Sequence, residues 1–275
     1  MKFVDLHVHT LFSDGTYSPE ELILQAQRVG LSAVSAVDHD TVEGIPLLIE
    51  SARSCGMEVI PGIELTAQYE RLEVHILGYL FDYHNQALLQ QLEALRVIRV
   101  ERIYKITEKL RGMGVSLDPA VVFSLSGSGT VGRLHIARAL VKEKLVSCIE
   151  QAFKKYIGDR SPAYVSGFKL SPQEAVALIK EAGGIPVLAH PYTITNDDAL
   201  LKIISSGIMG LEVHYPEHSQ AMVNFYLQLA QQYHLLVTGG SDCHGNAKSE
   251  IKIGSMKVPY EIVEKLKQAQ EGLRR

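Results

Sequence analysis

Short runs of apolar residues, some of them alternating with polar residues, recur along the chain and predict β-strands. The predicted strands span residues 3–9, 33–39, 58–66, 72–80, 185–190, 210–215 and 236–241. Most are separated by amphipathic stretches of helical length, at 18–29, 44–55, 171–182, 197–206, 219–233 and 259–272. The first of these stretches starts with Ser18 as N-cap and Pro19 at the first helical position. Alternating strands and helices predict an α/β fold with a largely parallel sheet.

One pair of strands breaks this alternation. About five residues separate the runs 58–66 and 72–80, whereas a parallel crossover needs about a dozen. These strands are therefore expected to form a hairpin. A turn centred near residues 68–69 would place Glu64 opposite His75.

The strand pattern also disappears between residues 84 and 160. Apolar residues at helical spacing from Leu88 to Leu110 predict one long helix. Shorter helices are predicted at 133–145 and 149–157, and the Gly/Ser-rich residues 124–132 are predicted to be a loop. This part of the chain is expected to be an inserted helical region.

Composition and charge restrict the possible functions. The 275 residues suit one α/β barrel or two ordinary domains. No apolar run reaches the roughly 18 residues of a membrane span, and the first strand carries histidines where a signal peptide would be apolar, so we expect a cytoplasmic protein. The three cysteines are far apart, which favours reduced thiols. A net charge of −4 gives no general attraction for polyanions, so a nucleotide ligand must be bound locally.

His7 and His9 lie two residues apart on a predicted strand, so both imidazoles point to the same side. An H-x-H pair by itself is weak support for a metal site, because strand histidines often serve packing or hydrogen bonding. Other candidate ligands lie near the carboxyl ends of the strands, where α/β proteins build their sites. They are Asp14, His39, Glu64, His75, His190, Asp242 and His244. Asp14 and Asp242 taken singly could be a turn cap and a helix N-cap, but nine such residues together predict a metal cluster.

The segments that carry these residues resemble the motifs of a known family. DLHVHTLFSDG, DHD, PGIEL, HILGY, AHP and GSDCHG are similar, in this order, to the motifs of the PHP (polymerase and histidinol phosphatase) superfamily. The stretch GRLHIARAL followed by FKKYIG and PAYV resembles the bacterial branch of nucleoside 3′,5′-bisphosphate phosphatases and 5′-3′ exoribonucleases.

The resemblance implies a distorted (β/α)7 barrel with a trinuclear metal centre. The barrel domain would comprise residues 1–82 and 162–275, and residues 83–161 would form an inserted helical subdomain that caps the substrate. The resemblance also implies one set of ligands for each of three ions. Glu64 would bind both the first and the second ion. These sets are His7, His9, Glu64 and Asp242; then Glu64, His75 and His190; and finally Asp14, His39 and His244.

These ligands suit manganese, zinc or iron, in two to three sites. Asp14 stands where some family members carry histidine, so the filling of the third site stays open. Three divalent ions together with the three ligand carboxylates would leave a net charge of about +3 if the histidines are neutral. Such a site favours an anionic substrate.

The remaining candidates concern substrate and catalysis. Arg133 and His135 are expected to bind a substrate phosphate, with a solvated surface pair as the alternative. Asp242 and His218 are the catalytic candidates, and His218 would contact the substrate or protonate the leaving oxygen. Asp5 could orient the His7 ring or simply meet water, and Cys243 is expected to pack rather than react.

The predicted function is metal-dependent hydrolysis of a phosphomonoester on a nucleotide such as a nucleoside 3′,5′-bisphosphate, by a metal-activated hydroxide. The alternatives are 5′-3′ trimming of short RNA with several insert arginines on its phosphates, hydrolysis of histidinol phosphate, and a non-catalytic interaction module. The expected partner is a small phosphorylated substrate, and no membrane or obligate protein partner is implied.

Overall fold

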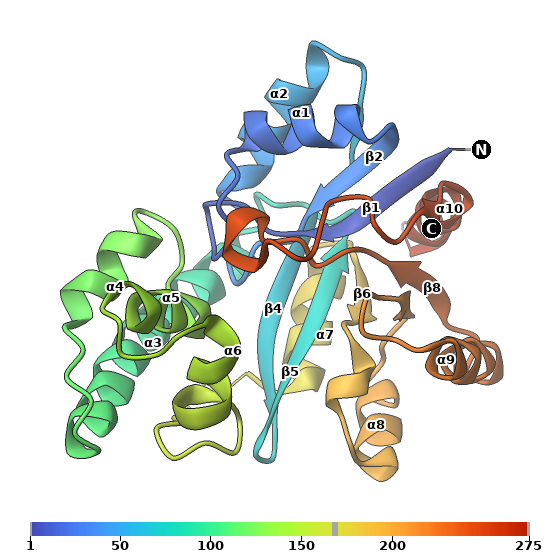
Figure 1. The fold of residues 1–275 in the computed structure, drawn as a ribbon. Helices are drawn as coiled ribbons and strands as arrows, with labels where there is room; N and C mark the ends of the chain where they lie inside the picture. Colours follow the sequence, from blue (N-terminus) through green and yellow to red (C-terminus); the bar gives the residue numbers. More distant parts are fainter. Residues whose placement is uncertain (1, 167–169, 274–275) are drawn as a thin grey trace.

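The computed structural model describes residues 2–166 and 170–273, and they form a mixed α/β fold (Figure 1). The first three strands in chain order are β1 (Phe3–Val8), β2 (Leu31–Ala36) and β3 (Glu58–Val59). They are followed by β4 (Gly62–Tyr69), β5 (Leu72–Tyr79), β6 (Ile185–Leu188), β7 (Gly210–His214), β8 (Leu236–Gly239) and β9 (Val258–Pro259).

The strands form two sheets that meet at their edges. One sheet has the order β3-β2-β1-β9 and the other the order β4-β5-β6-β7-β8. Single parallel bridges join the sheets on both sides, one between Val8 and Cys243 and the other between His39 and Glu64. The first bridge brings the carboxyl ends of β1 and β8 together, and the second brings the segment after β2 next to β4.

The strand predicted over residues 58–66 is divided into β3 and β4, which belong to different sheets. The break falls at Pro61, which has no N–H to donate to a strand ladder. Because of this break, Glu64 lies inside β4 rather than at the end of a strand.

The predicted hairpin is confirmed, but its register differs by two residues. Tyr69 pairs with Leu72, so the turn is at residues 70–71, and Thr66 rather than Glu64 lies opposite His75. Glu64 and His75 still share one face, because side chains alternate with a period of two along a strand.

Helices flank the sheets. Those before the insert are α1 (Pro19–Arg28) and α2 (Gly44–Arg53), and those after it are α7 (Pro172–Glu181), α8 (Asp197–Ile204), α9 (Gln220–Gln232) and α10 (Glu261–Leu273). Short 3-10 helices span η2 (Pro191–Thr193) and η3 (Gly245–Lys248). The predicted start of α1 is confirmed, since Ser18 accepts from the Glu21 N–H and Glu21 accepts from the Ser18 N–H.

The helical region between β5 and β6 lies to one side of the sheets (Figure 1). It packs around apolar residues of its own. Its elements are α3 (Gln86–Gly112), α4 (Pro119–Ser126), α5 (Arg133–Lys142), α6 (Ile149–Ala152) and the π-helix η1 (Phe153–Ile157). Helix α4 was not predicted from the sequence, and its last turn falls in the predicted loop 124–132. Asp118 as N-cap and Pro119 at the first turn were the start signals that could have revealed it. None of the helices within the described residues is both long and apolar enough to cross a bilayer.

Candidate metal centre and its pocket

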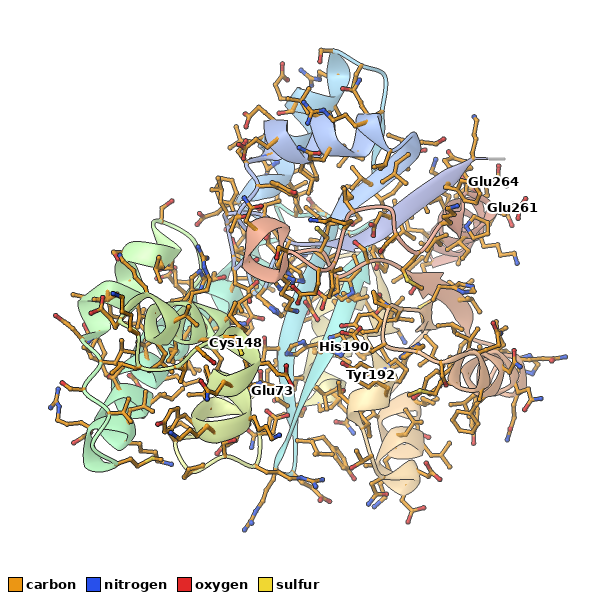
Figure 2. All side chains as sticks on the ribbon, viewed as in Figure 1. Glu73, Cys148, His190, Tyr192, Glu261 and Glu264 are labelled. Carbon is orange, nitrogen blue, oxygen red and sulfur yellow. The ribbon has the colours of Figure 1, made fainter. Side chains whose placement is uncertain are left out.

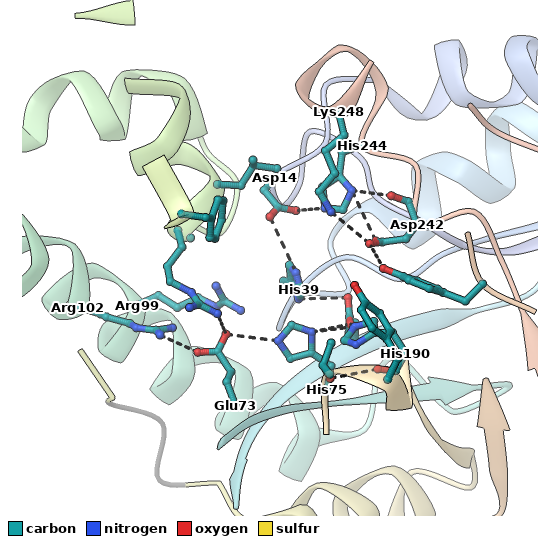
Figure 3. Close-up of a pocket in the computed structure, with 18 residues that line it drawn as sticks. Asp14, His39, Glu73, His75, Arg99, Arg102, His190, Asp242, His244 and Lys248 are labelled. Atoms are coloured by element: carbon teal, nitrogen blue, oxygen red, sulfur yellow. Dashed lines mark hydrogen bonds and ion pairs between the residues drawn. The ribbon is translucent and has the colours of Figure 1, made fainter. Parts of the chain in front are cut away.

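A pocket of about 210 Å³ lies where the ends of both sheets meet the helical region (Figure 3). Imidazoles and carboxylates from the sheets form one side of it, and arginines from α3 and α5 form the other. All nine side chains that the sequence predicts as ligands contact one another at this place.

Glu64 is at the centre of the cluster. Its Oε2 lies 3.4 Å from His7 Nε2, 3.2 Å from His9 Nε2 and 3.3 Å from His39 Nδ1. Its Oε1 lies 2.8 Å from His75 Nδ1 and 3.0 Å from His190 Nε2. One carboxylate therefore faces five imidazoles, with its two oxygens turned toward different groups.

Asp242 and Asp14 complete the cluster on the side of β1. Asp242 Oδ1 lies 3.3 Å from His7 Nε2 and 3.1 Å from His9 Nε2. Asp14 Oδ1 lies 3.2 Å from His244 Nε2, and Asp14 Oδ2 lies 3.9 Å from His39 Nε2.

Three groups of ligand atoms each lie within 4.8 Å of one another, so that one ion could bind each group. The groups are His7, His9 and Asp242; His39, Glu64 and His75; and His9, Asp14, His39 and His244. They overlap at His9 and His39. They differ from the sets implied by the family resemblance, because Glu64 is absent from the first group, His39 joins Glu64 and His75, and His190 is in none of the groups found among the described residues.

The fit of this cluster to metal ions rests on buried polar atoms without hydrogen-bond partners. His7 Nε2, His9 Nε2, His39 Nδ1, Glu64 Oε2 and Asp14 Oδ1 are buried and accept or donate no hydrogen bond within the described chain. Burying a polar atom without a partner costs about 1–3 kcal/mol, so five such atoms facing one another need a shared partner. A divalent cation provides that partner.

Without a metal, protons balance the same carboxylates. Although burial opposes it, the neighbouring carboxylates raise the pKa of His9 to about 9 and that of His75 to about 10. Despite burial, His39, His75 and His7 hold the pKa of Glu64 well below its usual range. Metal binding would displace these protons, as expected for ligands that bind ions in their deprotonated forms.

Two of these residues occupy left-handed backbone conformations that side chains rarely adopt. The φ angles are 24° at His190 and 53° at Asp242. The surrounding hydrogen bonds fix them, since the His190 N–H donates to Glu212 and the Asp242 N–H donates to the His7 carbonyl. Strain of this kind is typical of functional sites.

Comparison with known proteins identifies the family. Residues 5–98 match the model of the PHP domain. A 5′-3′ exoribonuclease of Haemophilus influenzae is 32% identical over 250 residues, which cover 88% of this chain and 90% of that protein. A 3′,5′-nucleoside bisphosphate phosphatase of Chromobacterium violaceum is 29% identical over 261 residues, with 92% and 91% covered. A crystal structure of a candidate metal-dependent phosphoesterase from Bifidobacterium adolescentis superposes with a TM-score of 0.88 at 32% identity, covering 96% of this chain and 95% of that one.

The chain belongs to the PHP family. It is a metal-dependent phosphoesterase, and its clusters of histidine and carboxylate are able to bind metal ions. The sequence prediction of a PHP-type hydrolase is confirmed.

The orientation of the PHP histidines depends on a residue that the sequence analysis did not select. Glu212, fully buried on β7, accepts from His7 Nδ1 at 2.8 Å and from the His190 N–H at 2.8 Å. Asp5 neither orients the His7 ring nor meets water, because it is buried and accepts the backbone N–H groups of Ser241 and Gly254. A glutamate between apolar residues in a buried strand was the available signal for Glu212.

Asp242 is also fixed from its outer side. Tyr215 donates its hydroxyl to Asp242 Oδ2 at 2.8 Å, and Lys248 Nζ lies 3.2 Å from the same oxygen. This leaves Asp242 Oδ1 directed at His7 and His9. Lys248 and Tyr215 also line the pocket, together with Tyr192, and the sequence analysis singled out none of the three.

Opposite the imidazoles, the helical region contributes a basic wall (Figure 3). Figure 2 shows Glu73 on the side of the helical region, with His190 and Tyr192 across from it. Arg102 lies 2.6 Å and Arg133 3.0 Å from Glu73, which reaches from β5 and lies 3.4 Å from His75 Nε2. Arg133 also contacts Asp159 at 2.5 Å. The structure therefore places Arg133 in the pocket lining and in ion pairs, rather than in the solvated surface pair considered as the alternative.

Two other candidates do not line this pocket within the part of the chain that is described. His135 is buried, its Nδ1 accepts from the Gly132 N–H at 3.1 Å, and burial lowers its pKa to about 4. His218 donates its Nδ1–H to the Val213 carbonyl at 2.8 Å, and its ring packs against Tyr192 and Tyr215. Cys243 is buried among apolar residues, as predicted.

Proposed function

We propose that this PHP phosphoesterase hydrolyses a phosphomonoester on a nucleotide, such as a nucleoside 3′,5′-bisphosphate, at a centre of three divalent metal ions. The observation that carries the proposal is that the cluster and a wall of arginines share one pocket. A substrate with two phosphates would place one at the metal ions and the other against these arginines, which here pair with Asp40, Glu73 and Asp159. The name of the Chromobacterium violaceum relative supports the same substrate class.

In this proposal the ligands are His7, His9, Asp14, His39, Glu64, His75, His190, Asp242 and His244. Bound metal ions would lower the pKa of water and stabilise the charge that develops on the transferred phosphoryl group. Glu212, Tyr215 and Lys248 keep His7 and Asp242 in the orientation that the ions need. Arg133 would bind the phosphate that does not react.

We propose a fold-level assignment as well. The two bridged sheets would make up a distorted (β/α)7 barrel of residues 1–82 and 162–275, and residues 83–161 would form a helical subdomain over its site. The bridges at Val8 and His39 support the closure. The separate apolar cluster between Ile103 and Ala163 supports the subdomain.

A second candidate is 5′-3′ trimming of short RNA by the same centre. The Haemophilus influenzae relative carries that name. Both reactions hydrolyse a phosphate ester at one centre and differ in what extends from the reacting phosphate.

Metal analysis and a substrate screen test the proposal. We expect the purified protein to carry more than one equivalent of manganese, zinc or iron, because the ligands exceed what one ion of four to six coordination can use. We expect it to release phosphate from nucleoside 3′,5′-bisphosphates, and a strong chelator should remove both properties. A fully loaded protein that hydrolyses no phosphate ester would instead support an interaction module.

Substituting Arg133 by alanine should affect only substrates with a second phosphate. Because the metals bind the reacting phosphate, loss of the charge-assisted contact should lower kcat/KM for a nucleoside bisphosphate about ten- to a hundred-fold. Hydrolysis of p-nitrophenyl phosphate should change little, and Arg133→Lys should keep part of the bisphosphate activity. An equal loss on both substrates would show that Arg133 supports the fold or the reacting centre, through its contacts with Glu73 and Asp159.

A further inference from the structure

A second pocket, of about 310 Å³, is built on the same two elements as the metal pocket. Helix α5 contributes Leu134 to the metal pocket and Arg138 to the second one. The segment after β1 contributes Asp14 to the first and Gly15 and Thr16 to the second. Residues four apart lie on the same face of a helix, with Cβ atoms about 5–6 Å apart, so the second pocket starts roughly one turn of α5 away from the first.

Arg138 brings a cation to this pocket without an anion to balance it. Arg99, Arg102 and Arg133 each form ion pairs with carboxylates. Within residues 2–166 and 170–273, Arg138 makes neither an ion pair nor a hydrogen bond. It is half-buried, and burial lowers its pKa.

The acidic group whose charge acts on Arg138 is Asp14. The Asp14 carboxylate is already directed at His244, His39 and His9, where a metal ion would compete for it. The N–H donors of the half-buried Arg138 guanidinium can therefore bind a further anion.

The rest of the lining suits a phosphate. The end of α4 contributes Ser124 and Ser126, whose hydroxyls donate to the Val121 and Phe123 carbonyls, and the loop after it contributes Ser128. The residues that line this pocket in the described chain include no aspartate or glutamate. The loop is held in place, because the Thr130 N–H donates to the Phe12 carbonyl at 2.9 Å. At Gly129 a Cβ would come within 2.6 Å of the Leu11 carbonyl oxygen, so only glycine permits this close approach.

We propose that this second pocket, bounded by Arg138, residues 124–128 and residues 15–16, binds a phosphate group. The proposal rests on the proposed nucleotide phosphatase activity. The phosphate has two chemical sources: the next phosphodiester of a nucleotide chain whose terminal phosphate lies at the metals, or a free phosphate. The shared walls favour the first source, because an offset of one helical turn is comparable to the spacing of neighbouring phosphates in a nucleic-acid backbone.

The experiment compares substrates of different length in matched variants of the metal-loaded enzyme. Arg138→Gln removes the charge, Arg138→Lys keeps it, and Arg111→Gln removes an exposed arginine charge from the end of α3 as the control. The measured quantity is the ratio of kcat/KM for a 5′-phosphorylated tetraribonucleotide to kcat/KM for a nucleoside bisphosphate. We expect this ratio to fall about tenfold in Arg138→Gln and to change little in the other two variants. In Arg138→Gln, the slope of log kcat/KM against log salt concentration for the tetranucleotide should become shallower by about 0.7, the value expected for the loss of one phosphate contact with a single strand.

A calorimetric titration with inorganic phosphate separates the remaining outcomes. An unchanged ratio with one phosphate equivalent lost in Arg138→Gln would assign the pocket to free phosphate. An unchanged ratio with unchanged phosphate stoichiometry would overturn the proposal. If the wild-type enzyme hydrolyses neither substrate, the proposed function fails, and the titration still decides whether the second pocket binds phosphate.

Discussion

Replacing Glu64 by alanine is expected to remove more than one equivalent of metal and to lower kcat/KM for phosphate esters by at least about a hundred-fold. Loss of a residue that only supports a metal ligand costs up to about a hundred-fold, and Glu64 is itself a candidate ligand. The reason is its position. Its two oxygens face different imidazoles, with His75 and His190 on one side and His7, His9 and His39 on the other. A carboxylate placed in this way can serve two ions at once.

His244→Ala is the matched comparison. The His244 ring contacts Asp14 and Asp242 at one edge of the cluster, so its loss should affect one ion. Metal content per chain, measured after dialysis of both variants, and circular dichroism, as a test of folding, decide the question. Equal losses of one ion in the two variants would contradict a bridging role for Glu64.

The candidate ligands could be predicted because each of them lies on a recognisable strand or in the segment that follows one. The two-residue error in the hairpin register did no harm, since a shift by two keeps Glu64 and His75 on one face. The division of residues 58–66 into two strands escaped prediction, although Pro61 marked the place. The missed α4 also had its start signal, at Asp118 and Pro119. These are errors of local boundaries, and they leave the placement of the cluster unchanged.

The supporting residues could not be predicted in the same way, because they meet the ligands across the fold. Glu212 is 205 positions from His7 in the sequence, and Arg133 is 60 positions from Glu73. Periodicity places a residue on a face of its own strand or helix but does not say what faces it. Closeness in sequence does not establish a contact between side chains, since Asp5 binds backbone N–H groups instead of the nearby His7 imidazole.

The residues that would bind the substrate could be predicted from the sequence only in part. Arg133 lies in the pocket, as its predicted role requires, but its ion pairs with Glu73 and Asp159 mean that a phosphate would have to share it. The assignments of His135 and His218 stay predictions. Lys248, Tyr215 and Tyr192 are among the pocket residues that can donate a proton or a hydrogen bond to a leaving oxygen.

Glu212→Gln is expected to weaken metal binding and lower kcat/KM by about ten- to a hundred-fold, although the variant keeps the shape of the side chain. An ionised carboxylate only accepts hydrogen bonds, so Glu212 holds the proton of His7 on Nδ1 and leaves the Nε2 lone pair directed at Glu64 and Asp242. A glutamine whose oxygen still accepts from the His190 N–H presents its NH₂ group to His7 Nδ1. That arrangement favours the other tautomer and puts a proton on the nitrogen that a metal ion needs.

The control for this prediction is Glu217→Gln, which removes an exposed carboxylate close to Asp242 and Lys248. It lowers the local negative charge but changes no hydrogen bond to a histidine ring, so metal affinity should change far less than in Glu212→Gln. Competition with a chromogenic chelator measures the affinities, and nitrogen NMR of the histidine rings in the zinc-loaded proteins reports which nitrogen of His7 carries the proton. If both variants lose affinity equally and the His7 tautomer is unchanged, Glu212 acts through its charge alone. A larger loss in Glu212→Gln, with the proton moved to Nε2, would establish that this buried carboxylate prepares His7 for the metal.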